Sequence, residues 1–237
     1  MSGSRVINRL LGVPRSAIEL NRSLQLLASL RQLGWHQTLG HGAPVDSAGE
    51  PLPWYTYPCI EWLEQRLRAS DAIFEFGAGS STLWYGRRVQ RVVAVDHDPD
   101  WFGRLAPLVP ANADLRLRAS LDDGGVGGVQ RSPSDYLAAI EEFPQGSFDV
   151  VAVDGMERVA CAMAALRHLK PDGLLVFDNS DRPDYRTAID DLRDHGAKRI
   201  DFCGFYPGAG VPGCTSVFSW SFDRWLCGDA VITSWGL

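Results

Sequence analysis

Short hydrophobic runs alternate along this chain with segments long enough to form helices. The runs typical of strands lie at residues 72–76, 91–95, 114–118, 149–153 and 173–177. Strands that follow one another through helical crossovers form a parallel sheet, and the crossover helices cover both of its faces. The pattern therefore predicts an α/β fold with a mostly parallel sheet and helices on both sides.

The C-terminal part of the pattern differs, because two strand-like runs follow each other without a helix. They span residues 198–202 and 215–220 and are joined by a loop at 204–213. Strands connected without a crossover pair in antiparallel fashion. With these two, the expected sheet has seven strands and ends in an antiparallel hairpin.

The N-terminal part carries a helical pattern of its own. Leucines recur at three- and four-residue spacing at positions 20, 24, 27 and 30. They predict a helix over 16–33, and the glycines and prolines after it predict a loop or lid over 34–53. The chain is accordingly divided into an N-terminal helix and lid (1–53), a main domain (54–220) and a C-terminal tail (221–237), which is expected to pack on the domain or on a second subunit of a homodimer.

Composition narrows the class of protein. With 237 residues, 45% hydrophobic and 22% charged, the chain is long enough for one domain with a full core. The net charge of −6 offers no basic surface for nucleic acid or an anionic membrane, and no run approaches the roughly 18 apolar residues of a membrane span. The five cysteines form no C-x-x-C pair, so reduced, buried thiols are expected, with neither a zinc site nor a disulfide framework. A cytoplasmic location follows from these features.

The strongest chemical signal is a glycine turn after the first strand. The strand runs into Gly77-Ala78-Gly79-Ser80-Ser81-Thr82, and the next strand ends in Asp96, roughly 20 residues on, which is the usual spacing for a ribose-binding acid. A dinucleotide site needs a third glycine where Thr82 stands. Glu75, two residues before the first glycine, suits the ammonium of an adenosylmethionine compound better than an anionic pyrophosphate.

These residues resemble the class I S-adenosylmethionine-dependent methyltransferases over roughly residues 55–220. More narrowly, the chain is similar to an uncharacterised group of that family. The shared motifs are Tyr55-Thr56-Tyr57-Pro58, Phe74 to Thr82, Asp154-Gly155, Asp178-Asn179-Ser180-Asp181-Arg182 and Cys214-Thr215-Ser216-Val217-Phe218. The resemblance implies a Rossmann-like fold and S-adenosylmethionine as cofactor.

The resemblance also implies a role for each residue of the cofactor site. Asp96, with His97 beside it, would bind the ribose hydroxyls, and Glu75 would hold the amino group. The backbone amides of Gly77, Ala78, Gly79, Ser80 and Ser81 would face the methionine carboxylate at a helix N-terminus. Ser120 would meet the adenine edge, and Trp101 would cover the ring or serve as core packing.

Oxygen-bearing side chains follow two further strands. Asp154 ends the fourth strand and Asp178-Asn179 ends the fifth, which resembles the Mg²⁺ site of catechol- and caffeoyl-CoA-type O-methyltransferases. An Asp-Asn pair can also cap a turn or bind substrate without an ion. Where those enzymes carry a lysine, this chain has Glu157, which leaves Glu157, Asp181 and His97 as candidate general bases.

The function expected is methyl transfer from S-adenosylmethionine to an oxygen, or a nitrogen, of a small molecule, with Mg²⁺ as a candidate second cofactor. Arg158 and Arg182 favour an anionic or sugar-like acceptor, although Arg158 could instead form a salt bridge with Asp181. Two alternatives stay open: an NAD-dependent oxidoreductase, and a non-catalytic domain that binds S-adenosylmethionine or a protein partner.

Overall fold

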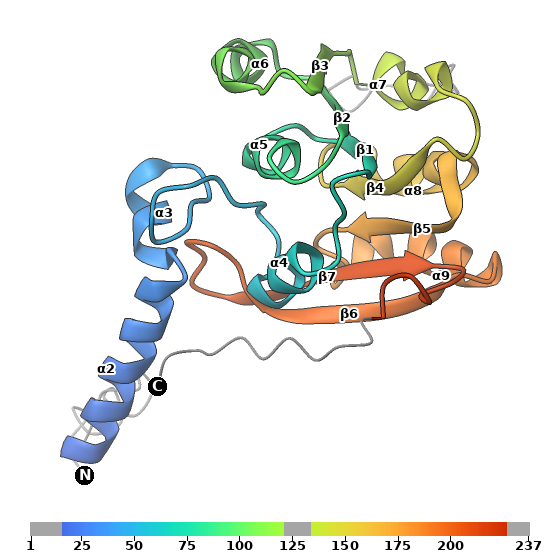
Figure 1. Ribbon diagram of the computed structural model, residues 1–237. Helices are drawn as coiled ribbons and strands as arrows, with labels where there is room; N and C mark the ends of the chain where they lie inside the picture. Colours follow the sequence, from blue (N-terminus) through green and yellow to red (C-terminus); the bar gives the residue numbers. More distant parts are fainter. Residues whose placement is uncertain (1–15, 121–133, 227–237) are drawn as a thin grey trace.

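Seven strands form one mixed sheet in the order β3-β2-β1-β4-β5-β7-β6 (Figure 1). The structure is a computed structural model that describes residues 16–120 and 134–226. The strands are β1 (Ala72–Phe76), β2 (Arg91–Asp96), β3 (Ala113–Leu117), β4 (Phe148–Val153), β5 (Leu169–Phe177), β6 (Lys198–Phe205) and β7 (Pro212–Ser219). The first five pair in parallel, and β7 is antiparallel to both β5 and β6, which confirms the predicted sheet and hairpin.

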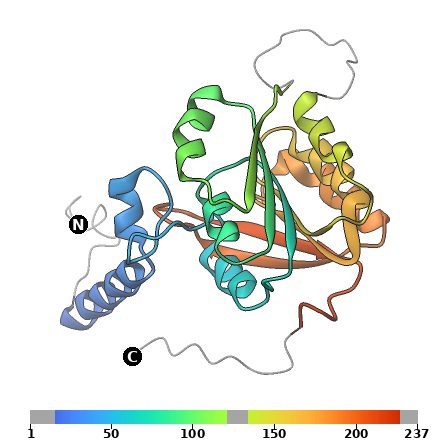
Figure 2. The same cartoon turned by 45° about the horizontal axis from the view of Figure 1, so that its top comes forward.

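Helices cover both faces of the sheet (Figure 2). On one side lie α4 (Tyr57–Glu64), α5 (Ser80–Gly86) and α6 (Pro99–Leu105), and on the other lie α7 (Asp135–Ala138), α8 (Arg158–His168) and α9 (Arg186–Asp194). Three short 3-10 turns occupy Ala106–Leu108, Ala139–Glu142 and Pro183–Tyr185. The result is the three-layer arrangement of a Rossmann-like fold.

The core is divided by the sheet into two layers, because successive side chains of a strand point to opposite faces. In β1, Ile73 packs with the α4 and α5 layer, whereas Phe74 and Phe76 pack with the α7 to α9 layer. The ring of Phe74 lies 5.4 Å from that of Phe148 in an edge-to-face arrangement. Each such buried aromatic side chain contributes about 2–3 kcal/mol through removal of its surface from water.

The N-terminal helix forms where the leucine spacing predicts it. It is α2 (Ala17–Gln32), capped by the Ser16 hydroxyl, and it projects away from the sheet in both views (Figures 1 and 2). No residue of α2 is buried, and Leu20 and Leu24 are half exposed, at 50% and 53%. Most of the leucine face is therefore exposed, at Leu20, Leu24 and Leu27, and Leu30 at its C-terminal end is partly buried.

The segment 34–53, expected as a loop or lid, contains a short helix, α3 (Trp35–His41). Two tryptophans fix this segment to the loop between β6 and β7. The indole N–H of Trp35 donates to the Ala209 carbonyl at 2.8 Å, and that of Trp54 donates to the Pro207 carbonyl at 3.0 Å. The prediction of a loop or lid is thus wrong for Trp35–His41, which forms a helix held to a distant part of the chain through Trp35.

The C-terminal tail packs on the domain as far as the structure describes it. The Trp225 side chain is fully buried and stacks on Trp62 with a centroid distance of 6.1 Å. Beside it, the Arg224 guanidinium forms ion pairs with Asp71 and Asp149 at the amino ends of β1 and β4. The rest of the predicted tail, residues 227–237, lies outside the described residues.

Two cysteines are joined rather than free. Cys203 and Cys214 face each other across the β6–β7 pair, with Cα atoms 4.2 Å apart, and form a disulfide. The expectation of reduced thiols is therefore wrong for this pair, because the hairpin register brings opposite positions together. Cys59 and Cys161 are buried thiols that form no disulfide with any described residue, and Cys227 lies outside the described residues. None of the described helices has both the length and the apolar character needed to cross a bilayer.

Candidate active site

A cavity of about 720 Å³ opens at the carboxyl edge of the parallel strands. This is the edge at which open α/β sheets bind their ligands. Its lining includes the glycine turn, the acids that end β2, β4 and β5, and the side chains Trp54, Trp101, Met156, Arg182 and Tyr206. The cavity thus joins the predicted cofactor residues to the predicted acceptor residues in one space.

The glycine turn is shaped by the close approach of two strand ends. Gly77 has φ +98°, and a Cβ there would lie 2.5 Å from the amide nitrogen of Gly155 after β4. A Cβ on Gly155 would in turn lie 2.1 Å from the Tyr136 hydroxyl. Both positions therefore require glycine, and the turn that opens the cavity depends on them.

Several amides of this turn are already bonded within the protein. Gly77 donates to the Val95 carbonyl at 3.0 Å, and Gly79 donates to the Thr82 hydroxyl at 3.0 Å. The Ala78 amide donates to the Asp96 carboxylate at 3.1 Å. The amides of Ser80 and Ser81, in the first turn of α5, have no intrahelical partner by position and are those best placed to meet an anionic group.

Asp96 lies at the end of β2, where its side chain lines the cavity. One carboxylate oxygen accepts from Ala78, and the other accepts from the Asp98 amide at 3.0 Å. Burial raises the pKa of Asp96, and the Asp98 and Ala78 amides oppose that shift. A carboxylate held in this way keeps further lone pairs for donors in the cavity. His97 also lines the cavity, with its Nδ1 3.5 Å from Asp96.

Glu75 lies behind the turn, fully buried, and is not among the residues that line the cavity. It accepts a hydrogen bond of 2.5 Å from the Thr82 hydroxyl, which itself accepts from Gly79. Burial raises the pKa of Glu75 to about 7, partly offset by hydrogen bonds from Ser81 and Thr82. The structure therefore gives Glu75 a part in supporting the turn, and its predicted contact with the cofactor amine stays a prediction.

The two residues predicted to meet the adenine differ in position. Trp101 lines the cavity, and its indole N–H donates to the Ala78 carbonyl at 2.8 Å, which fixes the ring beside the turn. Ser120 is buried, is not among the lining residues, and donates to the Glu157 carboxylate at 2.8 Å. Of the two, Trp101 is the better placed for a stacking contact.

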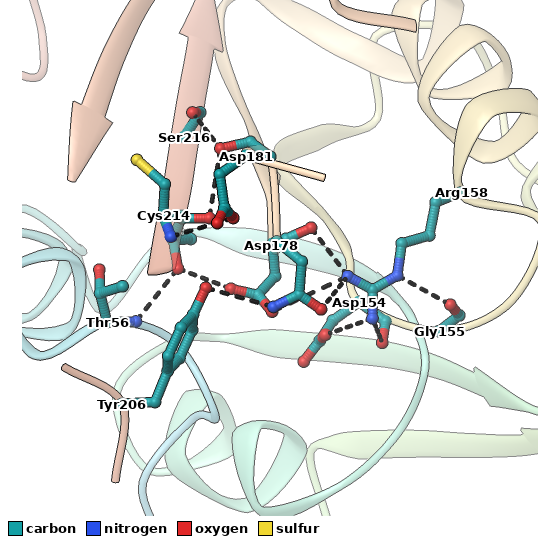
Figure 3. A network of polar contacts seen from close by, with 12 residues as sticks. Thr56, Asp154, Gly155, Arg158, Asp178, Asp181, Tyr206, Cys214 and Ser216 are labelled. Carbon is teal, nitrogen blue, oxygen red and sulfur yellow. Dashed lines mark hydrogen bonds and ion pairs between the residues drawn. The ribbon is translucent and has the colours of Figure 1, made fainter. Parts of the chain in front are cut away.

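The three predicted metal ligands meet at the ends of β4 and β5, as the strand order requires. Figure 3 shows Asp154 and Asp178 at this place. All three line the cavity. Asp178 accepts a hydrogen bond of 2.6 Å from the Thr215 hydroxyl, and Asn179 donates to the Tyr206 hydroxyl at 3.2 Å. Burial raises the pKa of Asp178 to about 6 and that of Asp154 well above its ordinary value, which the nearby Asp178 charge raises further.

These three side chains are held by a guanidinium. Arg158 lies 3.0 Å from an Asp154 carboxylate oxygen, 3.2 Å from the Asn179 amide oxygen and 3.8 Å from Asp178 (Figure 3). A divalent ion would need the same oxygens and would meet a fixed positive charge among them. The residues therefore do not fit Mg²⁺ as they are arranged. The salt bridge considered between Arg158 and Asp181 is also wrong, since Arg158 pairs with Asp154 and Asp178.

The three candidate general bases, Glu157, Asp181 and His97, differ in whether they reach the cavity. Glu157 accepts from Ser120, and Asp181 accepts from the Cys214 amide at 3.2 Å. Neither is among the residues that line the cavity, whereas His97 is. Asp178, predicted from the sequence only as a metal ligand, also lines the cavity and becomes a further candidate base, and its position after a strand that ends at the cavity is a usable signal.

The sequence and the fold were compared with those of known proteins. Residues 74–180 match a family model described as a methyltransferase domain. A search of curated proteins found no match. Among solved structures, the chain is similar to a precorrin-6y C5,15-methyltransferase from Geobacter metallireducens, with 18% identity, a TM-score of 0.49 and coverage of 68% of this chain and 87% of that one.

Two further solved structures give similar values. A methyltransferase-like protein from Silicibacter pomeroyi is 23% identical, with a TM-score of 0.41 and coverage of 71% of this chain and 89% of that one. A putative methyltransferase from Streptococcus mutans, solved in complex with SAH, is 11% identical, with a TM-score of 0.45 and coverage of 67% and 93%.

Proposed function

We propose that this chain, whose residues 74–180 match a model of a methyltransferase domain, is an S-adenosylmethionine-dependent methyltransferase that transfers a methyl group to an oxygen of a small-molecule acceptor. The observation that carries this proposal is the single cavity that Asp96 and the glycine turn share with Asp154 and Asp178. Its volume of about 720 Å³ lies within the range of roughly 300–1,000 Å³ that is usual for small-molecule sites.

The cofactor end of the cavity fits an adenosyl group. Asp96 supplies a fixed carboxylate for the ribose hydroxyls, and the amides of Ser80 and Ser81 supply donors for the methionine carboxylate. Trp101 supplies a flat apolar surface beside them. When bound, S-adenosylmethionine supplies an electrophilic methyl group on a sulfonium.

The acceptor end is formed by Trp54, Met156, Arg182 and Tyr206 around the acids of β4 and β5. An acceptor hydroxyl fits there because the carboxylates offer oxygens that accept its hydrogen. Asp178 is the carboxylate placed to remove that proton, since it lines the cavity and the Thr215 hydroxyl holds it in place. Arg182 on the wall favours an acceptor that carries a negative charge.

Two measurements test this function. Melting curves with S-adenosylhomocysteine or NAD identify the nucleotide, and a ligand at 100 times its Kd stabilises the native state by about 2.7 kcal/mol. S-adenosylhomocysteine is expected to raise Tm, and NAD is not. The protein is then incubated with methyl-labelled S-adenosylmethionine and small hydroxylated acids, phenols and sugars, and label is expected in an acceptor. A rise in Tm with NAD alone would contradict the proposal.

A further inference from the structure

We propose that Arg158 is the built-in cation of this site: its guanidinium takes the place of a divalent metal ion, and its removal uncovers a latent metal site formed by Asp154, Asp178 and Asn179. The proposal that Arg158 helps to orient the acceptor rests on the proposed function. The proposal of a latent metal site does not rest on it, because that site involves only residues at the ends of β4 and β5.

The first argument is the number of contacts. The Nε–H of Arg158 donates to the Gly155 carbonyl, Nη1 donates to the Asp178 carbonyl and the Asn179 side chain, and Nη2 donates to the carbonyl and the carboxylate of Asp154 (Figure 3). An arginine has five N–H donors, so these contacts use them all. All five N–H groups therefore donate to residues at the two strand ends, and none is left to donate to a substrate.

The second argument is electrostatic. The side chains of Asp154 and Asp178 are only 18% and 3% exposed, and each carboxylate lies within 4 Å of the same guanidinium, so the two share Arg158 as their counter-charge. The Arg158 side chain is itself only 11% exposed, and its guanidinium carbon lies 5.5 Å from the centre of the Tyr185 ring. Unlike an exchangeable metal ion, this cation is covalently part of the chain.

The third argument comes from local backbone geometry. Arg158 is the first residue of α8, four residues after Asp154, and the turn between them includes Glu157 at φ 48°. That left-handed conformation is uncommon for a glutamate and reverses the chain directly above the end of β4. Asn179 likewise has φ 55° at the end of β5. Both strand ends are bent at the guanidinium, which brings the carbonyl oxygens of Asp154 and Asp178 within its reach.

The contacts of Arg158 also fix the position of side chains at the acceptor end of the cavity. Because Arg158 binds the amide oxygen of Asn179, the amide nitrogen of Asn179 faces the Tyr206 hydroxyl and donates to it at 3.2 Å. Tyr206 is part of the cavity wall. Arg158 is therefore a positioning residue that sets the orientation of Asn179 and, through it, of one wall of the acceptor site.

Metal binding tests the proposal directly. The full chain and its Arg158→Ala variant are titrated with Mn²⁺ and followed by electron paramagnetic resonance and calorimetry. The wild type is expected to show no saturable site, and the variant is expected to gain one, with an affinity about 10-fold or more above any wild-type binding. Adding Asp178→Asn to the variant should abolish the gain, and Arg182→Ala, which removes another cavity arginine, should produce none.

Two results would overturn the proposal. The first is saturable Mn²⁺ binding by the wild type that is lost in Asp178→Asn, and this arm does not depend on the folding of an Arg158 variant. The second is an Arg158→Ala protein that keeps its S-adenosylhomocysteine melting shift yet gains no Mn²⁺ site. If Arg158→Ala fails to fold, Arg158→Met, which keeps the apolar stem, is titrated in its place and judged by the same two outcomes.

Activity measurements distinguish a failure of the Arg158 proposal from a failure of the proposed methyltransferase function. Methyl transfer by the wild type is expected to be insensitive to a chelator, whereas Arg158→Ala is expected to lose on the order of 100-fold in kcat because the acceptor wall shifts. Mn²⁺ should restore part of that loss in Arg158→Ala alone. Loss of wild-type activity on chelation would contradict the proposal, whereas a wild type that binds no S-adenosylhomocysteine would contradict the proposed function and leave the Mn²⁺ result to stand.

Discussion

Replacing Glu75 by glutamine is expected to stabilise the protein at pH 8 and to change its stability little at pH 4.5. Glu75 is fully buried, and its carboxyl group accepts from the Thr82 hydroxyl. Glutamine has nearly the same shape and keeps an oxygen for that hydroxyl. The substitution therefore removes the charge that burial makes costly and keeps the hydrogen bond that supports the glycine turn.

The magnitude follows from the pKa of Glu75, which burial raises from an ordinary 4.5 to about 7. Between these two values the folded state binds a proton that the unfolded state has released, so the free energy of unfolding falls as pH rises through this window. Each pKa unit corresponds to about 1.36 kcal/mol, and the shift therefore corresponds to about 3 kcal/mol. Glutamine does not titrate and lacks this loss.

Urea unfolding of the wild type and Glu75→Gln at pH 4.5, 6, 7 and 8 measures the effect. The difference in unfolding free energy between the two proteins should grow by about 3 kcal/mol from the lowest to the highest pH. The matched control is Glu64→Gln, which changes a half-exposed glutamate of α4 and should show no such trend. A difference that stays constant with pH would refute the assignment of the raised pKa to Glu75.

Three further perturbations test the contacts that hold the fold together. Arg224→Ala leaves the buried Asp71 without its cation, while Asp149 keeps its ion pair with Lys170, and should lower the free energy of unfolding by about 3–5 kcal/mol in urea. Gly77→Ala puts a side chain at φ +98° against backbone and should lower Tm and abolish the melting shift with S-adenosylhomocysteine. Reducing the Cys203–Cys214 disulfide, which closes a loop of sequence separation 11, should cost about 3 kcal/mol by urea titration, and Cys203→Ser should be insensitive to reductant.

The sheet could be predicted from sequence because its central strands are covered on both faces. Strands such as β4 (Phe148–Val153) are buried at every position, so their hydrophobic runs stand out from the helices between them. The glycine turn and Asp96 were recognisable for a related reason, since both lie at fixed distances from strands. Local signals thus sufficed for the fold and for finding the residues that line the proposed cofactor end of the cavity.

The features that could not be predicted from the sequence depend on contacts between distant parts of the chain. Helix α3 lies between two glycines that suggest a loop, and the bond from Trp35 to Ala209 that orders it spans 174 residues. The Cys203–Cys214 disulfide depends on the register of β6 and β7. The pairing of Arg158 with Asp154 is local, at i and i+4, but its contacts with Asp178 and Asn179 depend on β4 lying beside β5.

The central claim is that Asp96 holds the ribose of an adenosyl cofactor, and calorimetry with S-adenosylhomocysteine tests it most directly. Two hydrogen bonds to a charged group are worth about 1.5–3 kcal/mol each, so Asp96→Ala should weaken binding by roughly 100-fold or more. Asp100→Ala, which changes an exposed aspartate four residues away in α6, should bind like the wild type. Unchanged affinity in an Asp96→Ala protein with a native circular dichroism spectrum would contradict the account.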